Sequence, residues 1–260
     1  MTHLLRAELL RLRSRKLFHL FGVLIVGLLI LIAVLVFQHY GKPGQSLEYA
    51  VGLRNGMRIA ADILFSLSVV VGASFVGAEW TSGGMSSVLV WEPRRERVFG
   101  MKMASAAIGL FGAVLAVLAL VALVLVPTAA AHGSFGGMTG EWWRSTLGIW
   151  LRAGALASMG AAIGVGLAYL LRSAAGSIAT WLIFEFVASQ ALTLWKPGWF
   201  RWLPSGNVQL FIGPFGRGEF NGASLFPSSL SALRGGIVLG CYATGLLLAG
   251  FASFRARDVT

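Results

Sequence analysis

Long apolar runs separated by short polar segments dominate the hydropathy pattern of this 260-residue chain. An α-helix needs about 20 apolar residues to cross the hydrocarbon core of a bilayer. Runs near that length cover residues 17–37, 59–78, 103–126, 147–171, 174–194 and 235–254. The pattern therefore predicts an all-α polytopic membrane protein with six transmembrane helices, forming one transmembrane domain over residues 1–260.

Composition agrees with this class. Hydrophobic residues make up 57% of the chain and charged residues 12%, whereas charged residues are about 25% of a typical soluble domain. The net charge of +11 comes from basic residues at the ends of apolar runs, so we expect them to contact the lipid bilayer and not nucleic acid. The single cysteine, Cys241, excludes a disulfide within the chain, and the four histidines show no metal-ligand spacing.

Six spans place both termini on the same side of the membrane. That side carries twelve basic residues, while the other carries nine, spread over much longer loops. Positive charge concentrates in cytoplasmic segments. We therefore expect a multi-pass membrane protein with both termini in the cytoplasm.

The N-terminus resembles a signal peptide but is expected to be a retained anchor. Its apolar run, 17–37, exceeds a signal peptide's core of roughly 7–15 residues, and Gln38-His39-Tyr40 gives no small-residue cleavage site. In residues 1–16, leucines recur at helical spacing with arginines on the other faces. This segment is either an amphipathic helix on the inner membrane surface or a cytoplasmic extension of the first span.

Two further regions carry weaker signals. Small residues step along the fourth span every four positions, from Gly154 to Gly166, which lets helix backbones approach closely in lipid. Packing within the monomer explains this stripe, and a dimer seam is the alternative. Residues 195–234 are predicted to be an extracellular loop whose tryptophans suit the headgroup layer, although the loop could also shape a substrate exit.

A charged segment lies between the second and third spans. Ser82-Gly83-Gly84 is a strong helix interruption. Met85, Val88 and Leu89 then follow at i, i+3 and i+4, which predicts a short amphipathic helix.

A helical backbone conformation is disfavoured for the residue before a proline. Glu92 precedes Pro93, so the short helix should stop at Glu92. Pro93 suits the first turn of a new helix, which should continue through Lys102 into the third span. We therefore expect a short transverse helix between two breaks.

The residue order in this segment resembles that of permease subunits of type-2 ABC exporters, in a subgroup common in high-GC Gram-positive bacteria. The residues that carry the resemblance are Glu79, Ser82-Gly83-Gly84, Leu89, Pro93-Arg94-Arg95 and Lys102. Gly84 departs from the pattern, which commonly has threonine there. Six spans, a basic N-terminal segment and a long loop before the sixth span extend the resemblance to the whole chain, but only this segment is specific.

The resemblance implies that residues 79–102 form a coupling segment that docks on a separate ABC ATPase. The docking residues would be Met85, Val88, Leu89, Pro93 and Arg95. Glu79 and Lys102 would anchor the segment through salt bridges at the membrane boundary. The alternative is that these charges only solvate a loop and follow the positive-inside rule. Two copies, or this chain with a related permease, would face two ATPases.

The expected activity is therefore transport, not enzymatic chemistry. The chain has no Gly-x-x-x-x-Gly-Lys-Ser/Thr phosphate loop, so ATP and Mg²⁺ would bind the partner ATPase. No catalytic, cofactor-binding or metal-binding residues are predicted on this chain. Relatives of this type export drugs, antimicrobial peptides, lipid-linked molecules and sodium, and the sequence does not select among them.

Two acids fall inside predicted spans, Asp62 in the second and Glu185 in the fifth. A charge there costs about 2.5–3.5 kcal/mol on insertion scales, so both are candidates for lining a translocation path. Asp62 could instead pair with Arg58, and Glu185 could bond to a neighbouring helix. A secondary transporter driven by protons through Glu185 is the alternative function. A membrane-embedded enzyme is disfavoured, because no catalytic motif accompanies these acids.

Overall fold

The computed structural model describes residues 46–131, 139–213 and 232–256, together with ten isolated residues between positions 8 and 38. Within this part of the chain the fold is all-helical, without strands. The longest helices are α3 (Ser46–Thr81), α5 (Arg95–Ala131), α6 (Gly140–Leu171) and α10 (Ala232–Ala256).

A further long helical run contains a distortion. It begins as α7 (Ala174–Ile183), passes through a π-helical turn, η2 (Phe184–Ala188), and ends as α8 (Ser189–Trp195). Together with α3, α5, α6 and α10 it makes five helices that are long and apolar enough to cross a membrane. They coincide with five of the predicted spans. The predicted span 17–37 and the segment 1–16 lie largely outside the described residues.

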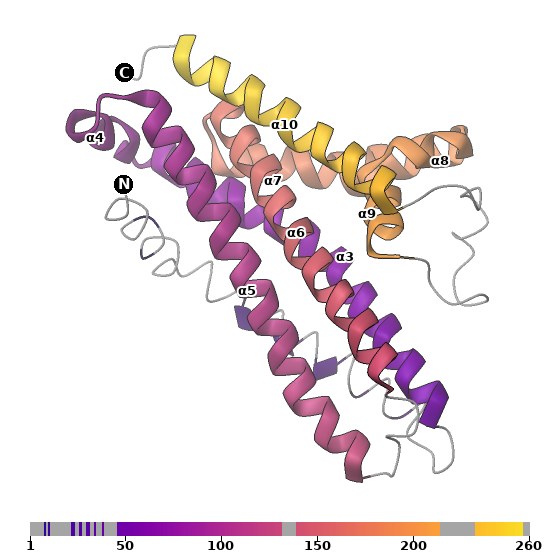
Figure 1. Ribbon diagram of the computed structural model, residues 1–260. Coiled ribbons are helices and arrows are strands. Elements are labelled where there is room, and N and C mark those ends of the chain that lie inside the picture. The colour runs from indigo at the N-terminus through magenta and orange to yellow at the C-terminus, as the bar shows by residue number, and fades with distance from the viewer. Residues whose placement is uncertain are drawn as a thin grey trace.

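Helix α6 is the centre of the fold and packs against α3, α5 and α10 (Figure 1). Its small residues allow close contact within the monomer. A methyl group added at Gly160 would meet the Phe65 carbonyl oxygen at 2.7 Å, and one at Gly164 would collide with the Val69 carbonyl oxygen, both on α3. The predicted stripe faces other helices: a methyl group at Gly154 would meet the Phe111 ring of α5 at 2.8 Å, and one at Gly166 would meet the Leu246 carbonyl oxygen of α10 at 2.6 Å. The small residues of α6 therefore serve packing within the monomer.

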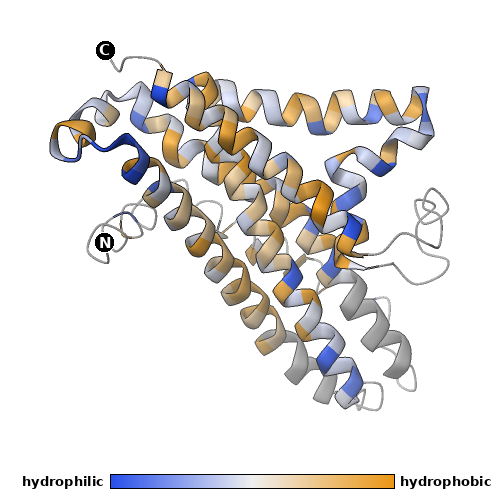
Figure 2. Ribbon diagram, turned by 45° about the horizontal axis from the view of Figure 1, so that its top comes forward, coloured by the Kyte–Doolittle hydropathy of each residue, from blue (hydrophilic) through white to orange (hydrophobic). Residues whose placement is uncertain are grey.

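The outer helices present apolar side chains outward. On α5, Ile108 and Leu123 are well exposed, although the helix is strongly hydrophobic along its body. Figure 2 shows hydrophilic residues gathered at the start of α5 and a hydrophobic stretch beyond. This distribution suits a helix that leaves an aqueous boundary and continues through hydrocarbon.

The region predicted as a long loop, 195–234, begins with ordered structure instead. Pro197 opens the 3₁₀ helix η3 (Pro197–Trp202), and Pro204 opens α9 (Pro204–Ile212). Proline is favoured in the first helical turn, where its missing N–H costs nothing, so each proline starts a helix in a region that was predicted to be a loop. Helix α9 packs on α10 and buries Val208 and Ile212. Residues 214–231 of the predicted loop lie outside the described residues.

The connection between α3 and α5 contains a short helix between two helix breaks, as the sequence predicted. Gly83 has φ +70°, a left-handed conformation that favours glycine, and it separates α3 from α4 (Gly84–Trp91). Glu92 is extended, with φ −130° and ψ 94°, so α4 ends where the proline requires. Pro93 was predicted to lie in the first turn of the next helix, but α5 begins two residues later, at Arg95. The carbonyl of Arg94 accepts the first bonds of α5, which places Pro93 just before the helix.

Several chain segments meet at the end of the bundle where α4 lies. The last turn of α10 contacts the start of α5 through Arg95, and Glu8 of the N-terminal segment contacts Lys102 of α5. The described N-terminal residue Glu8 and the C-terminal end of α10 therefore lie at the same end of the molecule as α4 (Figure 1).

Candidate functional site

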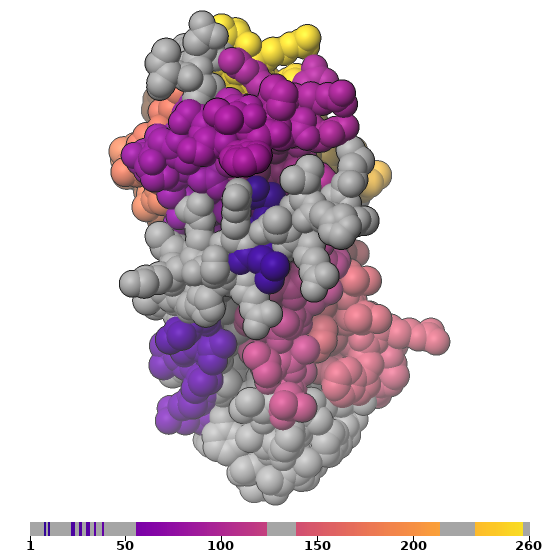
Figure 3. Space-filling view, turned by 90° about the vertical axis from the view of Figure 1, so that its left-hand side faces the viewer, coloured from indigo at the N-terminus to yellow at the C-terminus, as the bar shows by residue number. Residues whose placement is uncertain are grey.

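Helix α4 has two unlike faces, and both include apolar residues. On one face Met85 is 1% exposed, and the half-buried Val88 and Leu89 pack against the same core. On the other face Val90 and Trp91 are 80% and 89% exposed. Figure 3 shows the surface around α4, coloured purple to magenta, near the upper end of the molecule.

This arrangement corrects the predicted docking face. Met85, Val88 and Leu89 do share one side of the helix, as their spacing predicted, but that side packs on the chain's own helices. Met85 is therefore closed to a partner. Pro93 is exposed, whereas Arg95 is half-buried. The exposed residues in and just after α4 are instead Ser86, Ser87, Val90, Trp91 and Arg94.

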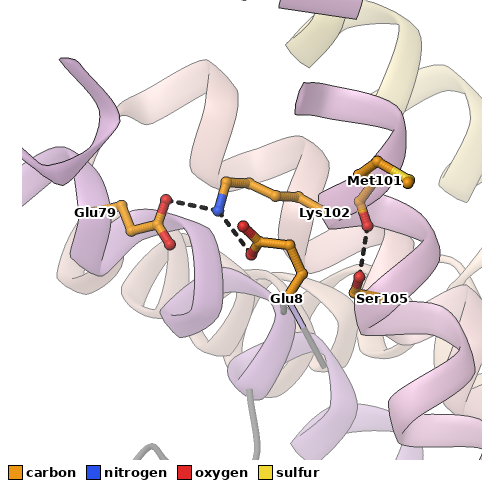
Figure 4. Close-up of polar contacts among 5 residues, drawn as sticks. All are labelled: Glu8, Glu79, Met101, Lys102 and Ser105. Atoms are coloured by element: carbon orange, nitrogen blue, oxygen red, sulfur yellow. Dashed lines mark hydrogen bonds and ion pairs between the residues drawn. The ribbon is translucent and has the colours of Figure 1, made fainter. Parts of the chain in front are cut away.

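A buried ion cluster, here called the triad, lies beside α4. Lys102 Nζ lies 2.7 Å from Glu79 Oε2 and 3.1 Å from Glu8 Oε2 (Figure 4). Lys102 is 1% exposed, and its ammonium also lies 5.2 Å from the centre of the Phe75 ring. The predicted anchor residues Glu79 and Lys102 are thus in direct contact, and Glu8 joins them.

The chemistry of the triad suits a rigid anchor. A buried ammonium is stable only when opposite charges and hydrogen bonds replace its water shell. Two carboxylates supply these, and the Glu79 distance is typical of a charge-assisted bond. Glu79 ends α3, Lys102 lies two turns into α5, and Glu8 belongs to the N-terminal segment, so one side chain ties three parts of the chain together.

Arg95 ties the start of α5 to the end of α10. Its Nη1 donates to the Phe254 carbonyl oxygen at 3.0 Å and to the Arg255 carbonyl oxygen at 3.4 Å. The last carbonyls of a helix lack intrahelical donors and carry partial negative charge, so a guanidinium stabilises them. Arg95 therefore holds helices together here and does not project freely toward a partner.

An aromatic cluster fills the space between these helix ends. Trp80, Phe99, Tyr169 and Phe254 contact one another with ring centres 4.7–6.2 Å apart. The guanidinium of Arg172 lies 4.7 Å from the centre of the Trp80 ring, a cation–π distance. These contacts join α3, α5, α6 and α10. The ends of these four helices therefore form a packed surface, here called the base, against which α4 lies.

Sequence reasoning missed Glu8, Arg172 and the outward pair Val90 and Trp91. One signal was available for Glu8, which is the only acidic residue before Glu48 and stands among several arginines. Arg172 was counted only as a topology charge. Val90 and Trp91 stand next to the predicted face, and spacing alone did not show which face would turn inward.

The two acids inside the membrane spans also approach each other. Phe65 and Trp181 contact with ring centres 5.8 Å apart. In antiparallel helices, Asp62 lies one turn before Phe65 and Glu185 one turn after Trp181, so both acids lie at the same level. Glu185 is close enough to Asp62 for their charges to interact. The structure thus brings the two candidate path residues together.

Glu185 lies in the π-helical turn and is 7% exposed. Among the described residues, its Oε2 has no hydrogen-bond partner. Arg58, the suggested partner of Asp62, lies by the end of α9. There its guanidinium approaches Gly213 beside Arg152, which donates to the Phe211 and Ile212 carbonyl oxygens.

The described residues contain no group of three or more His, Cys, Asp or Glu side chains that could hold a metal ion. The site is therefore built from a packed, ion-paired base and one exposed helical face. Comparison with protein-family models and with the sequences of curated proteins found no match.

Proposed function

We propose that this chain is the permease subunit of an ATP-driven type-2 ABC exporter in a bacterial plasma membrane. In this proposal the α4 end faces the cytoplasm, and the outward face of α4 docks on a separate ATPase that binds ATP and Mg²⁺. Two permeases, identical or related, would face two ATPases. The substrate would leave the cell through the transmembrane domain.

The observation that carries this proposal is the contrast between the faces of α4. Helix α4 lies between two breaks, packs on the core through Met85, and exposes Val90 and Trp91 on its other face. A contiguous apolar patch rimmed by polar residues is typical of an interaction surface, and Val90 and Trp91 are neighbours flanked by Ser86, Ser87 and Arg94. Tryptophan is among the residues most enriched in the centres of protein interfaces.

The surroundings of this face indicate the chemistry of the partner. Arg94 is exposed at its end, while Glu92 is paired with Arg97 at 3.1 Å. Within the described part of the chain, the charge left unpaired beside the apolar pair is therefore positive. An apolar pocket with acidic residues at its rim would complement this surface.

The headgroup layer of the membrane is the competing environment for Trp91, because tryptophan is also enriched there. The two environments differ in what covers the side chain. A docked ATPase would shield Trp91 only when the ATPase is bound, whereas lipid would shield it at all times.

Co-purification tests the proposal. Tagged chain from its native host should retain an ATPase with a phosphate-binding loop, and the purified complex should hydrolyse ATP. Trp91→Asp should remove the ATPase while leaving the permease folded. If no such ATPase accompanied the chain, or if Trp91→Asp bound it as the native chain does, the proposal would be wrong.

A proton-coupled secondary transporter is the second candidate. It is favoured by one observation, the placement of the buried Glu185 in a π-helical turn close to Asp62, because π-turns are frequent at functional sites and intramembrane acids often carry protons. Glu185→Gln and dissipation of the proton gradient should both stop such transport. ATP-dependent transport that survives loss of the gradient would exclude it.

A further inference from the structure

We propose that Asp62 and Glu185, here called the acid pair, bind the positively charged group of a lipophilic organic cation, and that such cations are the substrates of this permease. The charged group would lie beside the two carboxylates, between α3 and η2, and the apolar body against neighbouring aromatic rings. This inference rests on the proposed function, to which it adds the chemical class of the substrate.

The acid pair has no cation of its own in the described part of the chain. Glu185 is 7% exposed, and its Oε2 accepts no hydrogen bond from the described residues. The ion pairs found among these residues all lie at the α4 end of the molecule. A buried carboxylate is stable as an ion only beside an opposite charge, so a cation bound between the two acids would stabilise both.

Aromatic rings lie beside the acid pair. Trp181 lies one helical turn before Glu185. Its ring contacts that of Phe65 with centres 5.8 Å apart, and Phe65 lies one turn after Asp62. Phe184 adds a third ring, whose centre lies 6.2 Å from that of Trp181. The faces of aromatic rings attract cations, most strongly where water is excluded, and Trp181 is only 3% exposed.

An unpaired donor in the same place supports a ligand site. Trp181 Nε1 is buried and has no hydrogen-bond acceptor among the described residues. Buried polar groups are normally hydrogen-bonded. A buried donor without a partner, one turn from a buried acceptor without a partner, therefore indicates a site that a bound molecule completes.

The surroundings fit an organic cation better than a metal ion. Hard metal ions take about six or more oxygen ligands, whereas the described residues contain no group of three or more His, Cys, Asp or Glu side chains that could hold one. The hydroxyl of Ser189, one turn after Glu185, already lies 3.2 Å from that of Ser205. Two carboxylates among aromatic rings instead match a positive group on an apolar body, because small-molecule sites are mostly apolar with a few charged groups.

The π-helical turn joins the acid pair to an apolar surface. It buries Glu185, whereas Phe186 and Val187 of the same turn are 63% and 62% exposed among the described residues. Such turns are frequent at functional sites. A molecule with an apolar body and one positive charge matches both sides of this turn.

Binding of tetraphenylphosphonium to the purified permease tests the inference. The full chain, without the ATPase, is placed in lipid nanodiscs, and equilibrium dialysis of the radiolabelled cation is corrected with empty nanodiscs. Tetraphenylborate, an anion of the same shape, is the matched ligand control. The permease should bind the phosphonium and not the borate. Equal binding of both ions, or no phosphonium binding above that of empty nanodiscs, would overturn the inference.

Glu185→Gln and Asp62→Asn remove the two charges from different helices. Each should weaken phosphonium binding by roughly ten-fold, as loss of a bond to a charged group does, while Glu185→Asp should retain part of the affinity. Glu141→Gln is the control, because Glu141 is exposed at the start of α6, and it should bind as the native chain does. Thermal unfolding checks that each variant is folded. Native affinity in folded Glu185→Gln or Asp62→Asn would contradict the assignment.

Two further measurements address the identity of the ligand. Displacement of the phosphonium by sodium chloride, but not by potassium chloride at equal ionic strength, would assign the acid pair to sodium and overturn the inference. The phosphonium should also stimulate ATP hydrolysis by the complex with the co-purified ATPase, and binding without stimulation would show that the cation is not a substrate.

Failure of this site and failure of the proposed function give different results. Trp91→Asp should lose the ATPase but bind the phosphonium as the native chain does. If no ATPase accompanied the native chain, the proposed function would fail, whereas phosphonium binding to the permease alone would still confirm or reject the acid pair as a cation site.

Discussion

The two faces of α4 are made from neighbouring residues but meet different surroundings. Met85 is buried against the chain's own core, while Trp91, less than two turns further along, is 89% exposed. Both side chains are large and apolar, so hydrophobicity alone does not distinguish their functions.

The difference lies in what each face packs against. The inward face joins a base that the triad and the aromatic cluster hold rigid, so substitutions there should change the stability of the permease. Among the described residues the outward face contacts nothing comparable, so substitutions there should change binding to a partner. Stability and partner binding can therefore be varied separately.

The largest effect is expected from removing the cation of the triad. Lys102→Met leaves Glu8 and Glu79 buried without their shared partner, and breaking a buried ion pair in this way costs about 3–5 kcal/mol of folding free energy. Thermal or denaturant unfolding of the purified permease measures the loss. Lys196→Met is the control, because Lys196 is exposed; equal stability of both variants would show that the triad does not hold the base.

A smaller loss is expected on the inward face. Met85→Ala opens a cavity in a packed region, which typically destabilises by about 2–4 kcal/mol. Val90→Ala on the outward face should change the unfolding free energy by less than about 0.5 kcal/mol, as exposed substitutions usually do. The contrast between the faces is lost if both variants destabilise the permease alike.

A substitution on the outward face should change ATPase binding and not stability. Trp91→Ala should leave unfolding unchanged but weaken ATPase binding by about 2 kcal/mol, roughly 30-fold, which is typical of a central tryptophan in an interface. Titration of the purified ATPase against detergent-solubilised permease gives the dissociation constant. A dissociation constant equal to that of the native chain would show that the docking surface is not on α4.

The smallest effect is expected at the exposed pair between Glu96 and Arg255. Both side chains are about 70% exposed and their charged atoms lie 3.7 Å apart. Exposed ion pairs contribute about 0–1 kcal/mol, so Arg255→Gln should hardly change stability or ATPase binding. A large loss in either measurement would mean that the charges at this end act as a connected network.

Local chemistry accounts for what the sequence predicted of the fold. In the described part of the chain, the five helices long enough to cross a membrane follow from the lengths of the apolar runs, and the limits of α4 follow from Gly83 and Pro93. These features depend on residues close together in the chain, so spacing arguments apply to them. The helices η3 and α9 were missed because residues 195–234 were predicted to be a loop, although Pro197 and Pro204 suit the first turns of helices.

Contacts between distant residues could not be predicted in this way. Amphipathic spacing shows that a helix has two faces but not whether the apolar face meets its own chain or a partner, so Met85 was assigned to the wrong surroundings. The bond between Glu8 and Lys102 depends on how the helices fold back on one another. Only the isolation of Glu8 among basic residues hinted at it.

Cysteine accessibility gives the most direct test of the two-faced α4. In a Cys241→Ser background, Met85→Cys and Trp91→Cys are treated with a maleimide that does not cross membranes, in inside-out vesicles with and without the bound ATPase. Position 91 should react rapidly in the permease alone and slowly when the ATPase is bound, while position 85 should remain unreactive in both states. Rapid reaction at position 85, or reaction at position 91 that the ATPase does not slow, would contradict docking through the outward face.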